Sequence, residues 1–168
     1  MDFATRYDFL KTLITRYDGF YNLAAVKGSL LLTSNVIFLA PALGEHGVWR
    51  SLVAAGGTIQ ALTAVAAMFS LISMAFAALV IASTLLRPKA SEGPASLAFT
   101  ESVATIPLDE YRMGIADLSE TEVIADLARL AHLLAANLSA KFRYVNLSLA
   151  ALIGAIVTAF AAVVLAPG

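Results

Sequence analysis

The sequence contains no cysteine and only two histidines among its 168 residues, and only 14% of the residues are charged. The absence of cysteine excludes disulfides, thiolate nucleophiles and cysteine-ligated metals. The sequence also has no glycine-rich phosphate loop, no nucleophile elbow and no pair of histidines at metal-binding spacing. We therefore expect a protein that is not an enzyme, with no catalytic residue, no cofactor and no metal site.

Apolar residues, in contrast, make up 60% of the chain, and its mean hydropathy is +0.81. An ordinary soluble domain is about 45–50% apolar and about 25% charged. One core of this size cannot bury such an excess, so lipid must be the solvent for part of the chain. The net charge of −1 gives no indication of a nucleic-acid partner. We therefore expect the lipid bilayer to be a partner of the protein.

Three stretches are long and apolar enough to cross a membrane, because a spanning helix needs ~20 apolar residues. The predicted transmembrane helices cover residues 23–43, 58–86 and 145–166. The second lies in a longer charge-free run, and we place its start near the Gly56-Gly57 pair. Residues 44–57 are predicted to form a short outer loop. The first 20 residues are charged throughout and do not resemble a signal peptide.

The segments outside the spans also have helical patterns. In residues 1–22, apolar side chains recur at helical spacing with the charges on the opposite face, which predicts an amphipathic cytoplasmic helix. Residues 87–144 are predicted to form a cytoplasmic helical module. It begins with a proline-containing connector, 87–107, that includes a short extended piece at 96–99. Pro107 then opens a short helix, since proline fits a first helical turn.

A capping box at Ser119 and Glu122 predicts the start of a long helix. No proline or glycine follows until Gly154, and apolar residues recur at spacings of three and four. One helix over 120–166 would be ~70 Å long and would enter the third span without a break. The predicted fold class is an all-α membrane protein with three transmembrane helices and a small helical cytoplasmic domain. The last cytoplasmic helix is continuous with the third span.

The positions of the basic residues predict the orientation of the chain. Of the 11 lysines and arginines, only Arg50 lies in the loop between the first two spans. The positive-inside rule then places the N-terminus and residues 87–144 in the cytoplasm. The short loop and the C-terminus lie on the other side of the membrane.

Several polar or small residues in the spans are candidates for packing or function. Lys27, near the inner end of the first span, is expected to reach the lipid headgroups, with a pore-mouth or ligand contact as the alternative. Asn35, near mid-bilayer, is expected to bond to another helix. In the third span a seam of small residues recurs at every fourth position and allows another backbone to approach: Ala150, Gly154, Thr158 and Ala162.

Four cations of the cytoplasmic module are the candidate ligands for an anion: Arg112, Arg129, Lys141 and Arg143. The alternative for Lys141 and Arg143 is a role as headgroup anchors. The alternative for Arg112 and Arg129 is a helical ion pair, since an aspartate lies three residues before each of them.

A series of short motifs runs along nearly the whole chain in a distinctive order. They are a lysine with small residues at 26–29, a basic-proline stop at 86–89, Phe99, the pair Glu110-Tyr111, and Lys141-Phe142. In this order and spacing the chain resembles the transmembrane effector family of Pycsar. Pycsar is a bacterial anti-phage system signalled by cyclic pyrimidine nucleotides.

The resemblance implies a membrane effector that impairs the bacterial inner membrane when cyclic CMP or cyclic UMP is produced, with its C-terminus in the periplasm. The ligand would meet the four cations and stack on Phe99, Tyr111 or Tyr144. We also expect a homo-oligomer, because three spans cannot by themselves enclose an aqueous path. Two alternatives remain: a related membrane effector that a partner protein activates, and a structural membrane protein that oligomerises without a ligand.

Overall fold

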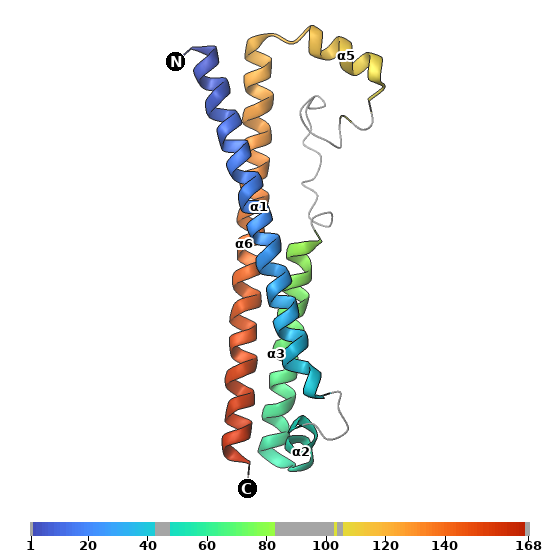
Figure 1. Cartoon of the computed structure of the whole chain (residues 1–168), viewed down its shortest axis with the longest axis vertical. Coiled ribbons are helices and arrows are strands. Elements are labelled where there is room, and N and C mark those ends of the chain that lie inside the picture. Colours follow the sequence, from blue (N-terminus) through green and yellow to red (C-terminus); the bar gives the residue numbers. More distant parts are fainter. Residues whose placement is uncertain (1, 43–47, 83–102, 104–105, 167–168) are drawn as a thin grey trace. The chain divides into compact units, whose positions relative to one another are not determined.

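The computed structural model describes residues 2–42, 48–82, 103 and 106–166. Its elements are all helical and follow the order α1, η1, α2, α3, α5, α6 (Figure 1). Their bounds are Phe3–Leu39 for α1, Ala40–Ala42 for the 3₁₀ turn η1, Val48–Ala54 for α2, Gly57–Ile81 for α3, Leu108–Ala116 for α5 and Glu120–Leu165 for α6. Helices α1, α3 and α6 are each long and apolar enough to cross a membrane. The predicted all-α class with three spans is therefore confirmed.

The chain forms two compact units. The first comprises residues 1–22 and 86–139 and is here named the extramembrane unit, because it lies outside the predicted spans. The second comprises residues 23–85 and 140–168 and is named the spanning unit. Helices α1 and α6 contribute to both units, since each runs without interruption from one set of residues into the other. The 46 residues of α6 measure about 69 Å at 1.5 Å per residue. The predicted continuity of this helix with the third span is confirmed.

Local side-chain signals account for the starts of these helices. Asp2 caps α1, because its Oδ1 accepts a hydrogen bond from the Thr5 amide at 3.1 Å. The capping box forms at α6: the Ser119 amide donates to Glu122 Oε2 at 2.8 Å, and the Glu122 amide donates to Ser119 Oγ at 3.3 Å. Pro107 stands immediately before α5 with φ of −57°, which suits entry into a helix.

The connection between α1 and α3 is more structured than the predicted loop. Residues 48–54 form the short helix α2, and α3 begins at Gly57, where the glycine pair predicted a start. Gly56 and Gly57 have φ of 70° and 55°, a left-handed conformation that glycine adopts without a steric penalty. The pair therefore turns the chain between α2 and α3. The extended piece predicted at 96–99 lies outside the described residues, as does most of its connector.

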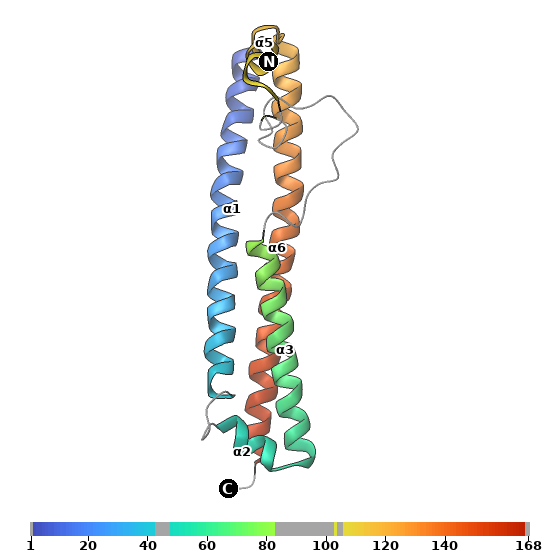
Figure 2. The same ribbon diagram turned by 90° about the vertical axis from the view of Figure 1, so that its right-hand side faces the viewer.

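In the spanning unit, α1, α3 and the C-terminal part of α6 lie side by side (Figures 1 and 2). Ala24, Val80 and Val145, one from each helix, form a cluster in which no residue is more than 5% exposed. Large apolar side chains on the outer faces are exposed, as contact with lipid requires: Leu30, Ile37, Met68, Leu71, Val157 and Phe160. The small size of Gly28 permits the close contact between α1 and α3.

The extramembrane unit contains a second contact between α1 and α6. The Tyr21 hydroxyl of α1 donates to the Leu134 carbonyl of α6 at 3.4 Å. Leu138, one helical turn further along the apolar stripe of α6, is only 7% exposed. The N-terminal helix thus contacts the long helix on the side of its apolar stripe. In contrast, no residue of α5 is buried.

Candidate functional site

A polar cluster lies inside the spanning unit. It consists of Asn35 from α1, Ser70 and Ser73 from α3, and Ser148 from α6, and each of these residues is 0% exposed. Inside a membrane each unsatisfied polar group costs several kcal/mol, so such residues need hydrogen-bond partners within the protein. In the part of the chain that the structure describes, every buried side-chain nitrogen or oxygen has a partner.

Asn35 connects α1 to α3. Its amide nitrogen donates to Ser73 Oγ at 2.8 Å and to the Leu31 carbonyl at 2.8 Å. Its Oδ1 accepts a hydrogen bond from Ser70 Oγ at 2.7 Å. Both amide protons and the carbonyl oxygen are therefore used. Asn35 makes the interhelical bond expected of an amide at this depth.

Ser73 extends the cluster from α3 to α6. Its hydroxyl donates to the Ser148 carbonyl at 2.8 Å, and the Ser148 hydroxyl donates to the Ser73 carbonyl at 2.9 Å. Each serine thus bonds to the main chain of the opposite helix, which requires the two backbones to approach closely. The complete cluster joins all three spans at one level.

The cluster contains no titratable group, so it has no means of moving a proton by acid–base chemistry. Its chemical role is to hold α1, α3 and α6 in one register. Interhelical hydrogen bonds in membranes contribute about 0.6 kcal/mol on average and up to about 1.7 kcal/mol. Because the polar groups face one another, in this arrangement they are not available to line a water-filled path.

Lys27 lies near the start of the spanning unit and beside an aromatic ring. Its Nζ is 5.7 Å from the centroid of the Phe142 ring, a cation–π distance. The residue is exposed, which is compatible with the predicted reach towards lipid headgroups. Tyr144, two residues after Phe142, stacks on Phe76 of α3 with ring centroids 6.0 Å apart. Aromatic contacts thus accompany the entry of α6 into the spanning unit.

The predicted anion ligands divide between the two units. In the extramembrane unit, Arg112 on α5 and Arg129 on α6 are both exposed, and Tyr111 is half-buried. Phe99, the other predicted stacking residue, lies outside the described residues. Arg112 and Arg129 are thus accessible cations of one unit, and their role as ligands stays a prediction.

Lys141 and Arg143 belong to the spanning unit and differ from each other. Arg143 is exposed, as a headgroup anchor must be, whereas Lys141 is only 6% exposed. The side chain of Lys141 is thus largely covered within the unit, and its role as a headgroup anchor stays a prediction. At about 100° per residue the two side chains lie about 160° apart around the helix axis, which explains why one faces the protein and the other does not.

The predicted seam of small residues in α6 only partly coincides with the packed face. Ala162 is buried and Phe69 lies against Gly154, but Ala150 is exposed. The Thr158 hydroxyl bonds within its own helix, to the Gly154 carbonyl at 2.8 Å. A four-residue spacing rotates by about 40° per step around a helix of 3.6 residues per turn, so such a seam leaves the packed face. In the part of α6 that belongs to the spanning unit, the buried small residues are Ser148, Ala151, Ala155 and Ala162.

Comparison with known proteins identifies the family to which this arrangement belongs. No curated protein and no solved structure matches the chain. The family model of the Pycsar effector protein domain, however, matches residues 9–168. This match includes all four members of the polar cluster, Arg112 and Arg129 of the extramembrane unit, and the whole of α6. The chain is therefore a multi-pass membrane protein that belongs to the Pycsar effector family.

Proposed function

We propose that this protein impairs the bacterial inner membrane when a cyclic pyrimidine nucleotide, cyclic CMP or cyclic UMP, binds to its extramembrane unit. The observation that carries the proposal is the continuity of α6. One helix of 46 residues begins at a capping box in the extramembrane unit and ends as a membrane span. Membership of the Pycsar effector family supports a role in anti-phage defence.

The ligand is an anion, and a bound phosphate needs charge-assisted donors. Arg112 and Arg129 are the accessible cations that we propose for this role, and Tyr111 lies next to the first of them in α5. A tyrosine ring offers a flat face on which a pyrimidine can stack. Phe99 is the second aromatic residue that we propose for stacking.

Coupling follows from the stiffness of α6. A ligand shifts a conformational equilibrium only by its differential affinity for the two states. Ligand binding must therefore favour a different position of the first part of α6. A continuous helix transmits such a displacement to its spanning part, where a loop would absorb it.

Damage to the membrane requires more than one copy of the chain. In the part of the spanning unit that the structure describes, the buried polar side chains have hydrogen-bond partners, and many large apolar side chains are exposed on the outer faces. A water-filled path needs a polar lining in which every backbone group is satisfied. We therefore propose a homo-oligomer in which triggered protomers rearrange their spans together.

The proposed orientation places the N-terminus in the cytoplasm and the C-terminus in the periplasm. A reporter of compartment that is fused after Gly168 should give a periplasmic signal. The same reporter inserted near Gly93 should give a cytoplasmic signal. A periplasmic signal from the reporter near Gly93 would contradict this orientation, since a cytoplasmic nucleotide could not then reach the proposed ligand residues.

The test of the trigger is nucleotide binding to the full chain in detergent, combined with toxicity in cells that produce the nucleotide. Arg112→Ala and Arg129→Ala, singly and together, should weaken binding and toxicity. Arg16→Ala is the matched control, because it removes an exposed arginine of the same unit that is not a proposed ligand. Unchanged binding and toxicity in the double variant would remove both arginines from the site. Failure of the wild type to bind either nucleotide would favour activation by a partner protein.

A further inference from the structure

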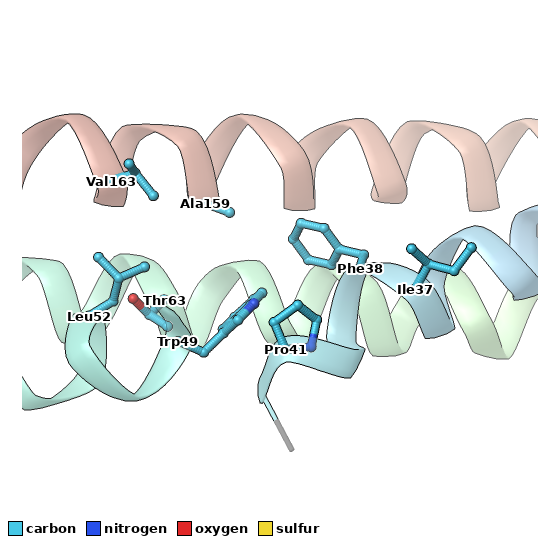
Figure 3. Close-up of a pocket in the computed structure, with 8 residues that line it drawn as sticks. All are labelled: Ile37, Phe38, Pro41, Trp49, Leu52, Thr63, Ala159 and Val163. Atoms are coloured by element: carbon cyan, nitrogen blue, oxygen red, sulfur yellow. The ribbon is translucent and has the colours of Figure 1, made fainter. Parts of the chain in front are cut away.

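A cavity of about 300 Å³ opens at the end of the spanning unit that carries α2. Phe38 from α1 and Trp49 from α2 extend into the space facing Ala159 and Val163 of α6 (Figure 3). The two aromatic rings contact each other edge to face, with centroids 5.3 Å apart. The short side chain of Ala159 leaves the space on the α6 side unfilled.

The walls of this cavity are apolar. Among the described side chains that line it, Thr63 carries the only hydroxyl, and its Oγ1 already donates to the Ile59 carbonyl of its own helix at 2.8 Å. The indole N–H of Trp49 is the remaining side-chain donor. An apolar cavity does not retain water, because a water molecule needs two to four polar partners, as a general rule. The walls therefore select an apolar occupant.

The location of the cavity determines which apolar molecule is available. The cavity is lined in part by α2, which lies between α1 and α3 in the sequence. Both α1 and α3 are long and apolar enough to cross a membrane, so the cavity lies where these spans reach the membrane boundary. Tryptophan is enriched at this depth, because its ring has an apolar body and one polar N–H. A methylene group occupies about 30 Å³, close to the volume of one water molecule in the liquid. The cavity therefore has room for roughly ten methylene groups.

A positively charged residue is the sequence neighbour of Trp49. Arg50 follows Trp49 in α2, is exposed, and is the only lysine or arginine between Lys27 and Arg87. A cation at the membrane boundary complements the phosphate of a lipid headgroup. We propose that the cavity binds one acyl chain of a phospholipid whose headgroup phosphate lies on the side of Arg50. This site does not depend on the nucleotide trigger.

Trp49 is the only tryptophan of the chain, so its fluorescence reports on this cavity alone. The experiment titrates a phosphatidylglycerol with dibrominated acyl chains, whose bromine atoms quench tryptophan at contact, into the full chain in detergent micelles. We expect quenching that saturates and that an excess of the unbrominated lipid reverses. Ala159→Leu fills the cavity and should abolish the saturable part, and Val163→Phe should do the same from the next turn of α6.

Ala150→Leu is the matched control, because it makes the same substitution at an exposed position of α6 outside the cavity. It should retain the wild-type titration curve, and circular dichroism should show that all variants keep their helix content. The proposal would be overturned if quenching never saturated and were equal in the wild type and both filled variants. Trp49 would then contact only bulk lipid. Emission that ignores lipid but changes on dilution of the protein would assign the cavity to a second copy instead.

Discussion

The Cγ1 atom of Val80 lies 3.1 Å from the point at which a Cβ atom would stand on Gly28. Val80 Cβ is 3.2 Å from the same point, and Val80 is fully buried. The β-branched side chain has little freedom to move, because one χ1 rotamer is strongly preferred in a helix. The missing side chain of Gly28 is therefore what allows α1 and α3 to pack at their present separation.

Gly28→Ala should destabilise the protein. Alanine improves helix propensity by about 1 kcal/mol, but overpacking against a buried side chain costs about 1–3 kcal/mol, so a net loss of about 1 kcal/mol is expected. The measurement is unfolding of the full chain in detergent. Gly19→Ala is the control, since nothing lies within 4 Å of its added Cβ, and it should stabilise instead. Equal shifts in the two variants would contradict the close contact.

Asn35→Leu should lower the free energy of unfolding by about 1–3 kcal/mol, because two interhelical hydrogen bonds to α3 disappear at similar side-chain volume. The same unfolding assay applies. Ser34→Ala is the neighbouring control: the Ser34 hydroxyl is exposed and bonds only to the Leu30 carbonyl of its own helix. A change below about 0.5 kcal/mol is expected there, as for other surface substitutions. If both variants lose the same stability, the cluster does not hold the helices together.

Acid should weaken the start of α6. The Ser119 hydroxyl and then the Ser119 amide donate to the Glu122 carboxylate, and these bonds lower the pKa of Glu122. A lowered folded-state pKa means that the stabilisation is complete above the pKa of an unfolded glutamate, about 4.3, and is lost as the pH falls through the folded value. Hydrogen-exchange protection at 119–123, corrected for intrinsic rates, should fall accordingly.

The control for this pH dependence is a pair of amide substitutions in the same turn. Glu122→Gln should remove the change in protection with pH, because glutamine does not titrate. Glu120→Gln should retain it, since Glu122 and Ser119 are both intact. An identical pH profile in the wild type and in Glu122→Gln would show that another group is responsible.

A break in α6 should separate ligand binding from its effect on the membrane. Ser139 is exposed and is the last residue of α6 in the extramembrane unit. Ser139→Pro removes a helical hydrogen bond and costs about 3 kcal/mol in a helix interior. Nucleotide binding should persist while toxicity falls, and Ser139→Ala should retain both. Full toxicity in a Ser139→Pro protein that still inserts would refute transmission through a stiff helix.

The predictable parts of this fold were those with a repeated or strongly local signal. Long apolar runs predicted the spans, because a membrane-crossing helix needs ~20 predominantly apolar residues. The spacing of Ser119 and Glu122 predicted a helix start, because those two side chains satisfy each other's backbone donors. Helix α2 was missed because seven residues are too few to show a helical period.

Only Asn35, one of the four members of the polar cluster, was predicted from the sequence. Asn35 was noticeable because an amide is rare inside a span, whereas serine is an ordinary residue of transmembrane helices and raised no expectation. The spacing of Ser70 and Ser73 places both on one face of α3, and this was the available signal. The pairing of Ser73 with Ser148 depends on the rotation of α6 about its axis, which no local pattern determines. The same rotation buries Lys141 and exposes Arg143.

The hydrogen bonds of the polar cluster also imply an order of events during biosynthesis. Asn35 and Ser73 are 38 residues apart in the chain, but Ser73 and Ser148 are 75 apart, so α6 leaves the ribosome well after the first two spans. Until then the hairpin of α1 and α3 can already provide hydrogen-bond partners for the Asn35 side chain. The hydroxyl and carbonyl of Ser73 still lack their partners on α6. The arrival of Ser148 gives the Ser73 hydroxyl its acceptor on α6. The last helix to be translated is thus the one that closes the three-helix assembly.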